Sequence, residues 1–164
     1  MAADLTPERL GALLTRTLED AAFVFAEAGD GAEPFPSPVL EARLRVEGPE
    51  AGELALAASP AMAEGLAANL LGLDRGDPEI GQRAADALGE LANILAGDVV
   101  LELFGPRAQA RIGVPRVREI PSAPGGVSPC AVTLATEDGA RPDARYRPVA
   151  RGPPWSACSS STTR

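Results

Sequence analysis

The sequence predicts an α+β domain in which one antiparallel sheet packs against a long helix pair and an N-terminal helix. The periodic segments follow the order helix, two strands, two helices, then two or three strands. Strands that follow one another directly pair as antiparallel hairpins, and separate blocks of strands and helices fit poorly with a doubly wound parallel sheet. The length of 164 residues suits a single domain.

The first helix is expected within residues 5–25. Thr6 is a candidate N-cap, and Pro7 suits the first helical position because its missing N–H would have no partner there. Apolar side chains recur at helical spacing at Leu10, Leu13, Leu14, Leu18 and Ala21. Residues 27–38 are rich in Gly and Pro and are expected to form a loop.

Two strands and two helices follow. Residues 40–48 alternate apolar and charged side chains, as a half-buried strand does, and a turn joins them to a second strand at residues 52–59. A helix with Ser59 as its N-cap then runs to Gly72. The longest periodic segment, residues 80–105, is a third helix.

The C-terminal third of the chain predicts further strands. Residues 110–120 are β-branched in part but contain a proline, so a strand there lies at a sheet edge or is bent. Residues 131–136 form a clearer strand, and residues 144–151 are its candidate partner. Residues 151–164 are small and polar and predict a disordered tail, which leaves residues 1–150 as the domain.

Composition excludes several classes of protein. A net charge of -8 disfavours nucleic acid and anionic lipid as partners. The chain has no histidine, which removes the usual catalytic triad and most catalytic zinc sites. Cys130 and Cys158 lack CxxC spacing and an activating histidine, so we expect reduced, unreactive thiols. Neither a secretory signal nor an apolar run of about 20 residues is present, so we expect a cytoplasmic protein without a membrane span.

The third helix carries a polar stripe. Asp86, Glu90, Asn93 and Gly97 fall within about 60° of one another around the helix, with Arg83 beside them. The opposite side supplies the core face, with Leu88, Leu91, Leu95 and Val99.

Two interpretations of this stripe remain open from spacing alone. Every surface helix needs a solvated face, and Asp, Glu and Asn are ordinary choices for it. However, Asn93 is a poor helix former, because its side chain competes for backbone hydrogen bonds. Gly89 and Gly97 border the stripe and each cost about 1 kcal/mol of helix stability relative to Ala. Close approach by another molecule would explain them.

The stripe resembles the signature of the CheC, CheX and FliY phosphatases of bacterial chemotaxis. That signature is Asp or Ser, three residues, Glu, two residues, Asn, and then a proline after about 22 residues. Asp86, Glu90 and Asn93 match it, and Pro115 follows Asn93 after 21 residues. The stretches ELANILAGDVV, IGVPRV and SPAMAEGLAANLLG are similar too, so the resemblance covers roughly residues 5–150.

The resemblance also implies a single active site. Family members with two sites repeat the signature on the first helix. This chain has Thr15 and Glu19 at the matching positions but Ala22 in place of the asparagine. The first helix is therefore similar to a degenerate copy, as in CheX-type members.

What the resemblance implies is hydrolysis of the aspartyl phosphate on a CheY-like response regulator. Asn93 would hold the attacking water in line with the phosphorus, and Glu90 would face a cation on the regulator. Asp86 would orient the helix or its neighbour, and Pro115 would support the site. This division of roles suits phosphoryl transfer, which depends mainly on positioning and charge.

The resemblance also implies which partners the chain binds. Arg83, Gly89 and Gly97 would help to dock a phosphorylated CheY-like regulator. Magnesium would come with the regulator, so the chain would have no metal ligands and no cofactor of its own. Because CheX-like proteins are dimers joined through their sheets, a homodimer is expected, paired at an edge near Pro115 or after Val132.

Alternatives remain beside this interpretation. The same fold could serve as a non-catalytic module that binds a response regulator or a flagellar switch protein. Asp74, Asp77 and Glu79 could hold a metal, but a solvated loop is the simpler interpretation. Ser128 lacks a base, and residues 29–33 are a turn rather than a phosphate loop because no GK[ST] follows.

Overall fold

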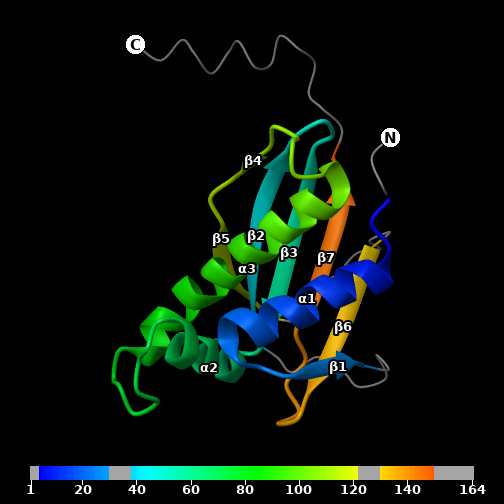
Figure 1. Cartoon of the computed structure of the whole chain (residues 1–164). Helices are drawn as coiled ribbons and strands as arrows, with labels where there is room; N and C mark the ends of the chain where they lie inside the picture. Colours follow the sequence, from blue (N-terminus) through cyan, green and yellow to red (C-terminus); the bar gives the residue numbers. More distant parts are fainter. Residues whose placement is uncertain (1–3, 30–37, 122–129, 150–164) are drawn as a thin grey trace, which may run out of the picture.

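The computed structural model describes residues 4–29, 38–121 and 130–149. Within these ranges, helices α1 (Pro7–Ala22) and α3 (Ile80–Phe104) lie across one face of a seven-stranded sheet, with α2 (Pro60–Leu70) at one end of it (Figure 1). All the strand pairs are antiparallel. The predicted α+β class is confirmed.

The sheet has the strand order β1-β6-β7-β3-β2, and both β4 and β5 pair with the remaining side of β2. The strands are β1 (Ala26–Ala28), β2 (Val39–Glu47), β3 (Gly52–Ala58), β4 (Arg111–Ile112), β5 (Arg116–Ile120), β6 (Cys130–Thr136) and β7 (Asp143–Pro148). The hairpins β2–β3 and β6–β7 are the two that the sequence predicts.

Both predicted N-caps are present. The Thr6 hydroxyl accepts a hydrogen bond from the backbone N–H of Arg9 at 3.2 Å, and that of Ser59 accepts one from Met62 at 3.1 Å. Each cap satisfies a donor that the first turn of a helix leaves without a partner. Gly72 follows the end of α2 with a φ of 67°, a backbone conformation that favours glycine.

The end of α1 differs from the prediction. The helix stops at Ala22, and Phe23 is left-handed with a φ of 55°, its N–H bonded to the carbonyls of Leu18 and Glu19. The chain then forms β1, two residues of which fall in the loop predicted at residues 27–38. Apolar Phe23 and Phe25 suggest a continuing helix face, but they are 72% and 62% exposed. The hydrophobic character of these two side chains therefore does not mean that they are buried.

The segment around Pro115 is confirmed as a bent edge. It forms two short strands, β4 and β5, which pair with β2 on either side of residues 113–115. The N–H of Gly113 still reaches the carbonyl of Arg45 at 2.7 Å. A proline cannot donate to a ladder, so Pro115 sits between the two paired stretches.

The core lies between the helices and the sheet. It is built mainly from leucines that are at most 1% exposed: Leu10, Leu14, Leu18, Leu54, Leu56, Leu66, Leu88, Leu91 and Leu95. Small alanines such as Ala42, Ala87 and Ala92 fill the space between them. The predicted core face of α3 is confirmed.

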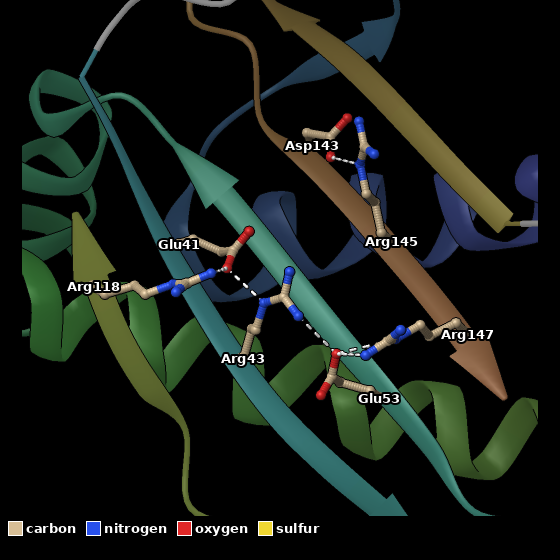
Figure 2. Close-up of polar contacts among 7 residues, drawn as sticks. All are labelled: Glu41, Arg43, Glu53, Arg118, Asp143, Arg145 and Arg147. Carbon is tan, nitrogen blue, oxygen red and sulfur yellow. Dashed lines mark hydrogen bonds and ion pairs between the residues drawn. The ribbon is translucent and has the colours of Figure 1, made fainter. Parts of the chain in front are cut away.

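The opposite face of the sheet carries a network of charged side chains. Glu41 is only 1% exposed and accepts hydrogen bonds from Arg43 at 2.6 Å and from Arg118 at 3.4 Å. Figure 2 shows Arg43 between Glu41 and Glu53, and Glu53 also binds Arg147. The hydrogen bond to Glu41 raises the pKa of the Arg43 guanidinium. The alternation in residues 40–48 predicts a solvated side here, but one carboxylate on that side is buried.

This burial makes the network sensitive to loss of one partner. Arg43→Met would leave the buried Glu41 carboxylate with Arg118 alone, so we expect a loss of about 2–3 kcal/mol in the free energy of unfolding. Adding Glu41→Gln, which removes the buried charge, should recover part of that loss. Urea unfolding measures both variants.

Arg45→Met is the matched control, because Arg45 pairs with the exposed Glu47 on the same strand at 3.3 Å. Such a surface pair contributes at most about 1 kcal/mol. A loss in Arg43→Met no larger than in Arg45→Met would contradict the role given to the buried carboxylate.

Some of the remaining predictions concern residues that the structure describes, and others concern residues outside those ranges. No helix in the described ranges is long and apolar enough to cross a membrane. Cys130 is a buried thiol, and its burial raises its pKa to about 11, which suits an unreactive cysteine. Residues 30–33, Ser128, Cys158 and the tail at 151–164 lie outside the described residues.

Candidate functional site

The α3 helix brings the predicted stripe together. Asp86 and Glu90 are exposed, whereas Asn93 and Gly97 are partly exposed on the same side. Leu88, Leu91 and Leu95 hold the opposite side of the helix in the core. The rigid helix therefore fixes the spacing between the carboxylate of Glu90 and the amide of Asn93.

The side chains of Glu90 and Asn93 make no hydrogen bond or ion pair with any other residue that the structure describes. An unoccupied carboxamide offers two N–H donors and one acceptor oxygen. An unoccupied carboxylate offers acceptors only, suited to a cation or an N–H group. Both side chains are thus available to another molecule.

Asp86 is paired within its own helix. Its carboxylate lies 3.4 Å from the guanidinium of Arg83, and both side chains are more than half exposed. Such an i, i+3 pair on the surface stabilises a helix by a few tenths of a kcal/mol at most. It positions Arg83 and Asp86 at the N-terminal end of the stripe.

Pro115 packs beside the stripe. A Cβ added at Gly89 would lie 3.5 Å from Cγ of Pro115 and 3.5 Å from Cγ2 of Val117. Gly89 is buried, so its small size serves the contact between α3 and the β4–β5 edge. The chain itself covers Gly89, which leaves Gly97 as the glycine that is open to another molecule.

Gly97 has no packing reason to be small. A Cβ added there would meet no heavy atom within 4 Å. The next residue, Asp98, ties α3 to α1, because its carboxylate accepts a hydrogen bond from Thr17 at 3.0 Å and lies 3.6 Å from Arg16. The sequence analysis did not identify Asp98, since no local pattern distinguishes a carboxylate that pairs with a distant helix.

On α1, the third position of the matching pattern is Ala22, which cannot present a side chain to a partner. Thr15 and Glu19 line a cleft of about 390 Å³ with residues of β1 and β6. Ala22 is fully buried, and its carbonyl accepts a hydrogen bond from Asn69 on α2 at 2.7 Å. The side chain at position 22 therefore faces other parts of the chain and not a partner.

In the acidic loop before α3, aspartate side chains accept hydrogen bonds from backbone N–H groups two residues further along the chain. Asp77 accepts a hydrogen bond from the N–H of Glu79 at 2.8 Å, and Asp74 accepts one from Gly76 at 3.5 Å. Among the residues with described positions, no group of three or more Asp, Glu, Cys or His side chains could hold a metal ion.

The fold is thus a layer of helices over an antiparallel sheet, and the Asp, Glu and Asn stripe lies beside a proline at the sheet edge. The family model described as chemotaxis phosphatase CheX matches residues 41–123, about half of the chain. The match includes Glu90, Asn93 and Pro115. This chain belongs to the CheX family.

Solved structures agree on the fold. CheX from Desulfovibrio desulfuricans superposes with a TM-score of 0.65 at 18% identity, over 85% of this chain and 96% of that one. CheX from Borrelia burgdorferi, in a complex with CheY, BeF3 and Mg2+, gives 0.63 at 20% identity, over 87% and 97%. FliY from Thermotoga maritima gives 0.54 at 14% identity, over 90% and 93%. A search of curated proteins finds no match.

Proposed function

We propose that this protein hydrolyses the aspartyl phosphate of a phosphorylated CheY-like response regulator. The observation that carries the proposal is the pair formed by Glu90 and Asn93, which share one helix face and have no partner among the described residues. Membership of the CheX family and the CheX–CheY complex from Borrelia burgdorferi support the choice of partner.

Hydrolysis of the aspartyl phosphate requires this chain mainly to position the attacking water. Hydrolysis requires a water placed in line with the phosphorus, and a carboxamide on a rigid helix can hold that water through its N–H donors and its oxygen. Asn93 takes this role. The metal ion, which would be held by the regulator, neutralises charge on the phosphoryl oxygens.

Glu90 fixes the docking register by binding a cation on the regulator, because a charge-assisted hydrogen bond is strong and directional. Arg83 contacts the partner one turn away, and Asp86, paired with Arg83 at the start of the stripe, orients it. Pro115 supports the helix from the side through Gly89.

The direct test is phosphate loss from a phosphorylated CheY-type receiver with Mg2+, with and without this protein. We expect acceleration that saturates as the concentration of the protein rises. Tight binding to the phosphorylated receiver with no acceleration would instead establish the non-catalytic binding module. Neither binding nor acceleration with the cognate receiver would leave the stripe as a solvated helix face.

Gly97→Ala separates docking from helix stability. Because the added methyl group meets no heavy atom within 4 Å and improves helix propensity, we expect the free energy of unfolding to rise by about 0.5–1 kcal/mol. If the regulator packs closely against Gly97, the same variant should raise KM for the phosphorylated receiver severalfold. Urea unfolding and initial-rate kinetics measure the two effects, and an unchanged KM would exclude Gly97 from the docking surface.

The expected homodimer and cytoplasmic location also remain proposals. The sheet has one edge at β1 and another at β4 and β5. The segment near Pro115 lies at the second edge, whereas β6 after Val132 is covered by β1 at Leu134 and Thr136. Light scattering that gives a monomer at micromolar concentrations would contradict the dimer.

A further inference from the structure

A cleft of about 710 Å³ on the sheet is lined by Arg43, Arg45, Arg116 and Arg118 together with Glu53 and Val114. We call this the arginine cleft. Arg43 and Arg116 are cross-strand partners, as are Glu41 and Arg118, so these side chains share one face of the sheet. That face is opposite to the helices, which lie behind the sheet in Figure 2.

The charge of the cleft is opposite to that of the chain. Four guanidinium groups and one carboxylate line it, although the net charge of the chain is -8. Glu41 and Glu53 offset part of this charge, but guanidinium groups remain in excess. An excess of positive charge in a concave surface raises the local concentration of anions, so an anion is attracted to this cleft.

One buried and one partly exposed carboxylate hold part of the cleft in place. Glu41, 1% exposed, binds Arg43 and Arg118, and Glu53 binds Arg43 at 2.9 Å. Arginines fixed in this way lose less conformational entropy when a ligand binds. The guanidinium of Arg43 is thus held by two carboxylates before any ligand arrives.

Two arginines in the cleft form no ion pair with Glu41 or Glu53 in the part of the chain that the structure describes. Arg116 is exposed and forms no ion pair with any residue in the described ranges. Arg45 is half exposed, and its guanidinium lies 3.3 Å from the exposed carboxylate of Glu47. Guanidinium groups bind phosphate oxygens in a bidentate way, through two parallel N–H donors.

We propose that the arginine cleft binds a compact phosphate-bearing small molecule of about nucleotide size. Its volume lies within the range of about 300–1,000 Å³ that is usual for small-molecule sites. A compact ligand fits better than a nucleic acid or a membrane, because the net charge of -8 on the chain disfavours contact with an extended polyanion. The site opens away from α3, so it is independent of the proposed phosphatase activity.

The test is calorimetric titration of the full chain with ATP, with inorganic pyrophosphate and with adenosine. We expect ATP to bind and adenosine not to bind. The variant Arg45→Ala/Arg116→Ala should weaken ATP binding at least tenfold, because it removes two charge-assisted contacts. Both residues are exposed and lie outside the Glu41 network, so the variant should still fold.

Arg75→Ala/Arg107→Ala is the matched control, since it removes the same charge from exposed positions outside the cleft. It should change ATP affinity less than twofold. Tighter binding of ATP than of pyrophosphate supports a nucleotide as the ligand, and equal binding supports recognition of the phosphate group alone. The proposal fails if neither phosphate compound binds, if adenosine binds as well as ATP, or if both double variants weaken binding equally.

Discussion

Asn93→Ala is expected to reduce the acceleration of phosphate loss from the receiver by about 100-fold or more. The physical reason is that the amide supplies position: without it, the attacking water is no longer held in line with the phosphorus, and misplacement by about 1 Å costs a factor of this size. The methyl group of Ala fits on the partly exposed helix face, so the fold should be kept. The measurement is single-turnover phosphate release at saturating protein.

The kinetic pattern distinguishes the two residues of the pair. Asn93→Ala should lower kcat with little change in KM, whereas Glu90→Ala should mainly raise KM, because Glu90 is assigned to docking. Gln109→Ala is a matched control that removes an exposed carboxamide outside the stripe, and its rate should equal that of the wild type. If Asn93→Ala kept the wild-type rate, the assignment of the catalytic amide would be wrong.

Gly52→Ala is expected to give the largest loss of stability from a single methyl group. An added Cβ would collide with Oη and Cζ of Tyr146, so the aromatic ring must move. Tyr146 is only 5% exposed and lies in the core cluster. Overpacking of this kind costs about 2–3 kcal/mol in the free energy of unfolding. Urea unfolding of the variant measures the loss.

The matched control is Gly65→Ala in α2, where an added Cβ meets no heavy atom within 4 Å. Its helix propensity improves, so we expect a gain of about 0.5–1 kcal/mol. Opposite signs for the two glycines would show that the contact with Tyr146 decides the result. Equal stability of Gly52→Ala and the wild type would mean that the ring can move aside freely.

Features set by a few adjacent residues could be predicted from the sequence. The caps at Thr6 and Ser59 depend on local geometry, and the bend at Pro115 depends on a missing N–H. The stripe on α3 could be predicted because a helix converts spacing in the sequence directly into position in space. The pairing of Asp86 with Arg83 is local in the same way.

Features set by distant contacts could not be predicted. The strand β1 has only three residues and no alternation, and it forms because β6 offers an edge to pair with. Glu41 occupies the polar side of an alternating strand, yet its burial depends on packing beyond its own strand. The arginine cleft joins β2 to β5, which are far apart in the sequence, so neither segment alone indicates it.

The buried position of Ala22 bears on what a single substitution on α1 can achieve. Asparagine at position 22 would place a carboxamide where the alanine is 0% exposed, and burying such a group without hydrogen-bond partners costs about 1–3 kcal/mol. One point mutation therefore lowers stability without presenting an amide to a regulator. An exposed amide at this position would require α1 to present another face to solvent.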